Sequence, residues 1–425
     1  MAAVPRPPQP INPAFNFSLP APRTSSGLMI WKAVEPAAAV VKKDLRDTES
    51  DCIGDLRTTY SIPNPGLLHY PAMNLSDYTF NPVLARASTI PARWYTDPAM
   101  LEGERRHVFG HTWQAVGRAD SVAAPGSYLG CEIAGEPVLV VRGQDGCLRA
   151  FSNVCLHRGS LLAEGPGHCS GQGAVIRCPY HGWTYALDGR LFGQPEFEGV
   201  EDWDRSQVCL PRFQVAEWGP FVFVNQDPDA PPLAEVLGAI PAGIAQMGCA
   251  IGRLRFSYRR DYAIACNWKV YIDNYLEGYH LPAAHPGLFR VLDYTQYRVE
   301  EHRYYSSQIA PIRGGNGQAL YYWVFPNFML NVYPDNLSSN LVLPLGPDRT
   351  LTVFEWFSEP EDAVKQATID FSDEIQREDI RICESVQRGL RSRHYNQGRF
   401  SVKRENGVHH FHGLLDEFLR RGADS

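Results

Sequence analysis

Two short segments of the sequence place a thiol close to an imidazole. The first reads CLH at residues 155–157, and the second reads CPYH at residues 178–181. Two such loops folded together would give two thiolates to one iron and two imidazoles to the other, which is the ligation of a Rieske [2Fe–2S] cluster. Structural zinc is the competing interpretation, although zinc sites usually pair Cys with Cys and His with His. The mixed pairs therefore predict a cluster bound by Cys155, His157, Cys178 and His181.

A second group of metal-binding residue types follows in a segment predicted to be helical over residues 267–281. Glu277 and His280 are three residues apart and would share one face of that helix. Pro282 should end or kink the helix, so that His285 can reach the same metal ion. Two histidines and one distant carboxylate form the facial triad of non-haem iron(II) sites, which leaves coordination positions open for O₂ and substrate.

The carboxylate is expected from a long amphipathic helix predicted over residues 361–391. Asp379 lies four residues before Cys383 and falls on the apolar, inward stripe of this helix. Glu384 shares its surface with several arginines, and Asp373 lies in the acidic first turn. A buried acid needs a partner, and a metal ion is a suitable one. Asp379 is therefore the predicted third iron ligand, with an inward aspartate bonded to polar backbone as the alternative.

The elements that must position these residues indicate an α+β fold. Short β-type runs between about 115 and 228, punctuated by Gly, Pro, Asp and Asn, predict a small antiparallel β domain, and a helix is predicted over 100–109. Strands are expected before Cys266 and around 319–333 and 338–356, followed by the long helix. The histidine-rich segment 409–412 fits a C-terminal helix or strand better than a metal site.

Composition excludes several classes of function. The chain has 425 residues and a formal net charge of −7, without the basic stripe that nucleic-acid binding requires. It contains no apolar run of about 18 residues, so no membrane span is expected. Ten cysteines are too sparse for a disulfide scaffold.

The first 75 residues differ from the rest. They are rich in Pro and Ala and contain no acidic residue before Glu35, which suits a targeting segment or a loosely ordered extension. The expected division is an extension at 1–75, a Rieske domain with its leading helix at 76–228, and a catalytic domain at 229–425. The expected compartment is the cytoplasm, or the plastid stroma if the extension is a transit peptide.

These motifs resemble those of the α-subunits of Rieske ring-hydroxylating oxygenases, and more narrowly the branch of choline monooxygenase, carnitine oxygenase and glycine betaine demethylase. The resemblance covers about 90 to 420 and rests on CLH and CPYHGWTYALDG within 155–189, NWKVYIDNYLEGYH and a later histidine within 267–285, and EDIRICESVQRGL at 378–390. It implies a Rieske domain joined to a helix-grip catalytic domain in a homotrimer. By motif position, Glu277 would carry electrons from a cluster histidine of one subunit to an iron-ligand histidine of the next.

The resemblance also implies the reaction. A separate NAD(P)H-dependent reductase or ferredoxin would supply electrons, and O₂ would be used to hydroxylate or demethylate a small substrate. The expected substrate is a quaternary ammonium compound such as choline or glycine betaine, for which aromatic faces at 304–305 and 321–325 are candidates. The alternatives are an aromatic ring-hydroxylating or O-demethylating oxygenase, and an electron-transfer Rieske protein without oxygenase activity.

Overall fold

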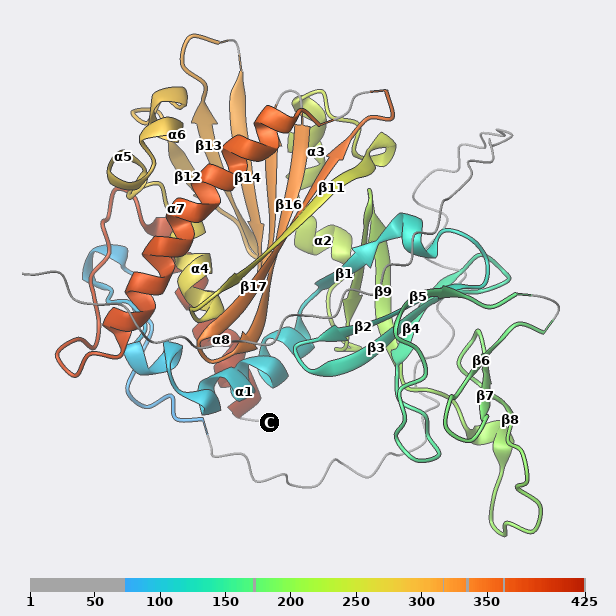
Figure 1. Ribbon diagram of the computed structural model, residues 1–425. Coiled ribbons are helices and arrows are strands. Elements are labelled where there is room, and N and C mark those ends of the chain that lie inside the picture. The colour runs from blue at the N-terminus through green and yellow to red at the C-terminus, as the bar shows by residue number, and fades with distance from the viewer. Residues whose placement is uncertain (1–72, 171–172, 316, 334–335, 362–363, 424–425) are drawn as a thin grey trace, which may run out of the picture. The chain divides into compact units, whose positions relative to one another are not determined.

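The computed structural model describes residues 73–170, 173–315, 317–333, 336–361 and 364–423. The targeting or disordered extension expected at 1–75 lies outside the described residues, apart from its last three. The described residues form two seven-stranded antiparallel sheets and one three-stranded sheet, with helices around them (Figure 1). The predicted α+β class is therefore confirmed. No helix in the described residues is long and apolar enough to cross a membrane.

The first large sheet has the strand order β1-β10-β9-β4-β3-β2-β5. Its edge strand β5 is formed by the segment between the two Cys/His loops. In this strand His168 pairs with Ser127 of β2. His168 also contacts the Pro125 carbonyl through Nε2 at 3.1 Å, so this histidine belongs to the sheet edge. The strands are β1 Gln114–Arg118, β2 Ser127–Ile133, β3 Glu136–Arg142, β4 Leu148–Ser152, β5 Gly165–His168, β9 Arg212–Trp218 and β10 Phe221–Asn225.

The three-stranded sheet β6-β7-β8 follows and carries the second Cys/His loop between its first two strands. Its strands are short, and their buried residues pack with both cysteines of the predicted cluster in one apolar core. The bounds are β6 Val175–Arg177, β7 Thr184–Ala186 and β8 Leu191–Gly193.

The second large sheet has the order β11-β17-β16-β15-β14-β13-β12. Helix α7 runs across one face of it, with α4, α5 and α6 beside α7 (Figure 1). The strands are β11 Arg255–Ile264, β12 Arg298–Glu301, β13 Tyr305–Pro311, β14 Gln318–Val324, β15 Phe328–Tyr333, β16 Asn336–Gly346 and β17 Arg349–Ser358. The α-helices are α1 Pro98–His107, α2 Leu233–Leu237, α3 Ile240–Gln246, α4 Trp268–Tyr275, α5 Leu281–Ala284, α6 Pro286–Val291, α7 Gln366–Leu390 and α8 Asn406–Ala423. Short 3₁₀ helices lie at Leu84–Arg86, Ala92–Tyr95, Phe109–His111, Ala119–Val122, Arg205–Gln207 and Ile251–Arg253.

The two large sheets share a hydrophobic core. Phe221 and Phe223 of β10 place their rings 5.1 and 5.2 Å from Phe328 of β15, and Phe221 also lies 5.0 Å from Phe357 of β17. Edge-to-face pairs of this kind add to the free energy gained by burying the rings. This contact joins the first large sheet to the second, through strands β10, β15 and β17.

Helix α4 is anchored to α1 by a buried ion pair. Lys269 donates from Nζ to Glu104 at 2.5 Å, and Trp268 donates from Nε1 to the other oxygen of Glu104 at 2.7 Å. Neither charged side chain has any exposed surface. Asn267 caps the helix by accepting from the Lys269 backbone N–H at 3.0 Å. These contacts hold α4 in place just before the iron-binding segment begins.

Replacing Lys269 by methionine is expected to lower the free energy of unfolding by about 3 kcal/mol or more, because the Glu104 carboxylate then stays buried without a cation. Denaturant unfolding followed by circular dichroism measures the change. The matched control is Arg298→Met, which breaks the exposed pair with Glu300 and should change stability by less than about 1 kcal/mol. Equal effects of the two substitutions would contradict the prediction.

Candidate active site and cluster-binding loops

The two Cys/His segments fold into matching tight turns. In the first, the Gly159 N–H donates to the Cys155 carbonyl at 2.9 Å, and in the second the Gly182 N–H donates to the Cys178 carbonyl at 3.2 Å. Both glycines have a positive φ, 71° and 73°, a conformation that a side chain would oppose. A glycine four residues after each cysteine thus turns each loop back, so that both of its ligands face the same way.

The side chains at the ends of these turns are arranged as a Rieske cluster requires. Cys155 and Cys178 are buried and pack in the same apolar core. The rings of His157 and His181 lie 4.6 Å apart at the surface, and Trp183 stacks on His157 at 4.8 Å. Burial would raise the pKa of Cys178, but N–H groups of Tyr180 and His181 and the Cys155 thiol lower it below its usual value. The two buried cysteines and the two histidines nearer the surface therefore fit the ligands of a Rieske [2Fe–2S] cluster.

Tyr185 adds a hydrogen bond to the sulfur of Cys155, a predicted cluster ligand. Its hydroxyl accepts from the Leu156 N–H at 3.0 Å and lies 3.4 Å from the Cys155 sulfur, so its own hydrogen points to that sulfur. The reduced cluster is more negative and gains more from this bond. Replacing Tyr185 by phenylalanine should lower the reduction potential by on the order of 40 mV, equivalent to about 1 kcal/mol for one electron. Spectroelectrochemistry measures it, and an unchanged potential would contradict the assignment.

The segment that carries the first iron-site histidine is a turn, and the helix predicted over 267–281 is wrong at its end. Helix α4 stops at Tyr275, and α5 begins at Leu281. The Glu277 carboxylate accepts from the backbone N–H groups of Tyr279 and His280, which replaces helical bonds by a local cap. A Cβ at Gly278 would lie 2.7 Å from the Tyr297 ring, so the chain passes close beneath this ring.

Pro282 also differs from its expected role. It lies in the first turn of α5, where its missing N–H costs no hydrogen bond, so that it starts a short helix. His285 lies between α5 and α6 as the cap of both, with a non-helical backbone conformation (φ −122°, ψ 70°). This break turns the His285 side chain back toward His280, and their rings lie 4.9 Å apart.

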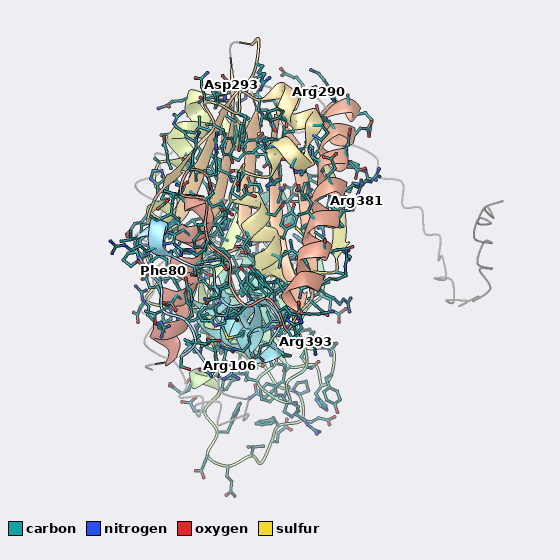
Figure 2. All side chains as sticks on the ribbon, turned by 90° about the vertical axis from the view of Figure 1, so that its left-hand side faces the viewer. Phe80, Arg106, Arg290, Asp293, Arg381 and Arg393 are labelled. Atoms are coloured by element: carbon teal, nitrogen blue, oxygen red, sulfur yellow. The ribbon has the colours of Figure 1, made fainter. Side chains whose placement is uncertain are left out.

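The two histidines meet Asp379 of α7. The imidazole nitrogen and carboxylate oxygen that each residue can offer all lie within 4.8 Å of one another. His285 Nε2 lies 2.9 Å from Asp379 Oδ1, and His280 Nε2 lies 3.8 Å from the same oxygen. The periodicity argument for Asp379 agrees with this placement, since Arg381 of α7 points away from the sheet (Figure 2). This donor set matches the two-histidine, one-carboxylate triad that binds iron(II).

Each histidine is held by a glutamate on its other ring nitrogen. His280 Nδ1 lies 2.5 Å from Glu277, and His285 Nδ1 lies 2.7 Å from Glu378. A carboxylate on Nδ1 fixes the tautomer that leaves the Nε2 lone pair for a metal ion. Sequence reasoning missed Glu378, although its place directly before Asp379 was a usable signal.

The charges around the triad favour a cation. Burial alone would lower the pKa of His285, but the Asp379 and Glu378 carboxylates outweigh it and raise this pKa above its usual value. Asn274 of α4 donates from Nδ2 to Asp379 Oδ1 at 2.7 Å and so orients the carboxylate. A divalent metal ion would balance the negative charge of the Asp379 and Glu378 carboxylates in the same way as the proton on His285.

A cavity of about 450 Å³ opens directly at the triad, between the second large sheet and helices α4 to α7. Eight aromatic side chains line it, among them Tyr297, Tyr321, Tyr333 and Trp356. Of the candidate segments 304–305 and 321–325, only Tyr321 lines the cavity. Tyr322 points to the opposite face of the strand, and Trp323 and Phe325 pack against Phe411 of α8. The other rings were not singled out in the sequence because they come from five separate segments: α4, the loop before β12, β15, β17 and α7.

The histidine-rich segment 409–412 lies in helix α8, as expected. His412 Nε2 contacts Asp273 at 3.0 Å, and His409 Nε2 contacts the Asn81 carbonyl at 2.8 Å. In the part of the chain that the structure describes, these histidines do not belong to a group of three metal-binding side chains. They tie α8 to α4 and to the segment before α1.

Fold and site together define a Rieske non-haem iron oxygenase, and the comparisons with known proteins agree. Residues 112–204 match the Rieske [2Fe–2S] domain, and residues 251–421 match the catalytic domain of the ring-hydroxylating α-subunit. The chain is 38% identical to chloroplastic choline monooxygenase of Arabidopsis thaliana over 79% of this chain and 84% of that protein. It is 34% identical to the carnitine monooxygenase oxygenase subunit of Escherichia coli (strain K12), over 79% of this chain and 94% of that subunit.

Solved structures give the same result. The quaternary ammonium Rieske monooxygenase CntA in complex with L-carnitine superposes with a TM-score of 0.69 at 31% identity, covering 78% of this chain and 96% of that chain. The chain belongs to the Rieske oxygenase family. Its cofactors are accordingly a Rieske [2Fe–2S] cluster and a mononuclear iron, and it requires electrons from an external donor.

Proposed function

We propose that this oxygenase oxidises a quaternary ammonium compound at the iron triad. The observation that carries the proposal is the aromatic cavity that opens onto His280, His285 and Asp379. Ring faces attract a cation that cannot donate hydrogen bonds, which is the chemistry of trimethylammonium groups. The printed names of the choline, carnitine and quaternary ammonium oxygenases support the same substrate class.

The side chains have distinct roles in this proposal. Cys155, Cys178, His157 and His181 hold the cluster, while His280, His285 and Asp379 hold iron(II). The bound iron supplies O₂ activation. The cavity residues orient the substrate carbon at the triad and exclude water, and Glu277 and Glu378 keep both histidines in the metal-binding tautomer.

We infer a homotrimer in which electrons cross between subunits. In the described residues, every side chain that lines the cavity lies between 271 and 379, so none comes from the cluster loops. Tyr180, beside the cluster ligand His181, is 58% exposed, and Tyr279, beside Glu277, is 57% exposed. Two exposed aromatic residues next to the two redox sites suit a contact between copies, with Glu277 as the bridge. The external donor in this proposal is a separate NAD(P)H-dependent reductase or ferredoxin.

Mixing inactive subunits tests this arrangement. Trimers reassembled from Cys178→Ser chains, which lack a cluster, and Asp379→Ala chains, which lack the mononuclear iron, should regain part of the wild-type activity. Reassembly of each variant with itself is the control and should stay inactive. No recovery in mixed trimers that are shown to form by mass spectrometry would contradict electron transfer between subunits.

The other assignments follow from the same proposal. We place the Rieske domain with its leading helix at 76–228 and the catalytic domain at 229–425. Of the alternatives, an oxygenase for aromatic substrates shares every iron ligand and differs only in cavity residues, whereas an electron-transfer protein would not need the triad and its cavity.

Turnover with a defined substrate panel tests the function. The purified enzyme, loaded with both iron centres, is supplied with a surrogate reductase and NADH, and products of choline, glycine betaine, carnitine, benzoate and vanillate are identified by mass spectrometry. Oxidation of a quaternary amine, lost in His280→Ala, is the expected result. Released formaldehyde would indicate N-demethylation, and an aldehyde product would indicate oxidation of the alcohol carbon. Turnover of the aromatic acids alone would overturn the proposal.

A further inference from the structure

One transverse row of the second large sheet forms the floor of the cavity. The strand registers place Gln308 beside Tyr321, Tyr321 beside Asn331, Asn331 beside Ser338, and Ser338 beside Trp356. All five side chains line the cavity. Three of them are uncharged polar groups, so the floor offers hydrogen bonds between the flanking aromatic rings.

The centre of this row is a fixed amide network. Asn331 accepts from the Tyr275 hydroxyl at 3.0 Å and donates from Nδ2 to Ser338 Oγ and to Asn340 Oδ1, each at 3.1 Å. Ser338 and Asn340 are 5% and 3% exposed. Because their oxygens already accept, each has a hydrogen left to donate, and no acceptor for it lies among the described residues. Both residues line the cavity, so an oxygen that enters it can accept these hydrogens and would be stabilised there.

The cavity offers no cationic side chain to a ligand. Glu277 and Asp379 are its only carboxylates among the described residues, and neither Lys nor Arg lines it there. These two carboxylates, together with Glu378 at 2.7 Å from His285 Nδ1, outnumber the charges of an iron(II) ion, so a bound ion leaves no net positive charge for a ligand carboxylate. Recognition of an ammonium group falls to the ring faces. A ligand carboxylate would be buried without a cationic partner, which opposes its binding strongly.

We propose that the cavity selects quaternary ammonium compounds whose second polar group is an uncharged oxygen, and that Ser338 Oγ and Asn340 Nδ2 hold this oxygen. Zwitterions that end in a carboxylate are rejected. The inference rests on the proposed function and names the substrate class within it. Ser338 and Asn340 thereby become specificity-determining residues.

Binding of matched ligands tests the selection. Isothermal titration calorimetry on the iron-loaded enzyme, without reductant, compares choline, ethyltrimethylammonium (choline without its hydroxyl), glycine betaine and carnitine. Choline should bind at least about tenfold more tightly than ethyltrimethylammonium, because ethyltrimethylammonium lacks the oxygen that accepts from Ser338 and Asn340. The two zwitterions should bind at least about a hundredfold more weakly than choline.

Two variants assign the effect to the floor. Ser338→Ala and Asn340→Leu should bring the affinities for choline and ethyltrimethylammonium to within about twofold of each other. Ser339→Ala is the matched control, since Ser339 is equally buried on the same strand but does not line the cavity. Retained ethyltrimethylammonium affinity shows that a variant is folded. If a variant no longer binds ethyltrimethylammonium, Ser338→Cys is used in its place, because a cysteine side chain has a similar size to serine but its thiol is a poor hydrogen-bond donor.

The outcomes separate the two proposals. Zwitterions that bind as tightly as choline, or an unchanged choline preference in both variants, would overturn the inference and leave the proposed function standing. If no quaternary ammonium compound binds at all, the proposed function falls and the inference falls with it.

Discussion

Replacing Asp379 by alanine is expected to remove the mononuclear iron and to lower product formation by more than about a thousandfold, because the ion supplies all of the oxygen chemistry. The two histidines that remain both direct Nε2 toward the same oxygen of Asp379, at 3.8 and 2.9 Å. Two neutral ligands without the carboxylate neither complete the triad nor balance the charge of iron(II). Colorimetric iron analysis and product yield measure both losses.

The cluster should survive this substitution, since its four ligands lie in separate loops. Its absorption spectrum therefore reports a folded chain. Asp373→Ala is the matched control on the same helix: this buried carboxylate accepts from the Tyr262 hydroxyl at 2.9 Å and pairs with Arg377, and it does not line the cavity. The control should keep its iron and its activity. Full iron content in Asp379→Ala would refute the ligand assignment.

Replacing Glu277 by glutamine is expected to lower turnover roughly a hundredfold even at saturating iron, where both iron centres are loaded. The carboxylate lies 2.5 Å from His280 Nδ1, and the neighbouring Tyr279 is exposed. In the proposed trimer, Glu277 joins this histidine to a cluster histidine of the next subunit. An uncharged amide retains the size of the side chain but holds both imidazoles more weakly.

Glu378 provides a matched control, because its carboxylate contacts Nδ1 of His285 as that of Glu277 contacts Nδ1 of His280. Glu378→Gln removes the charge beside His285 Nδ1 and should weaken iron binding by about 10- to 100-fold. At saturating iron, its electron transfer should be close to that of the wild type, measured by single-turnover reoxidation of the cluster. Equal loss of electron transfer in the two variants would mean that both glutamates only position the histidines.

Much of the chemistry was predictable from local spacing. The cluster motifs are short, and a glycine four residues after each cysteine is enough to bring each pair of ligands together. The helical period of α7 indicated Asp379 as the inward acid, because inward and outward faces alternate every three to four residues whatever the helix packs against. The predicted α+β class followed from the same kind of local pattern.

The helix predicted through Glu277 and His280 failed because propensity cannot anticipate a side chain that replaces backbone hydrogen bonds. The Glu277 carboxylate caps its own turn, and Gly278 fits beneath Tyr297, a residue from a later segment. Pro282 was correctly placed at a helix boundary, but at a start and not at an end. Such choices depend on contacts that form only when distant segments meet.

The sequence by itself determined the ligand types, their spacing within each loop or helix, and hence the two iron chemistries. The tertiary structure alone decided what surrounds the substrate. The row from Gln308 to Trp356 joins five strands through registers that are set by the packing of the whole sheet. Tyr321 faces the cavity and Tyr322 does not, because a strand's side chains alternate and the core chooses which face is inward. Selectivity therefore resides in long-range register, which local spacing does not encode.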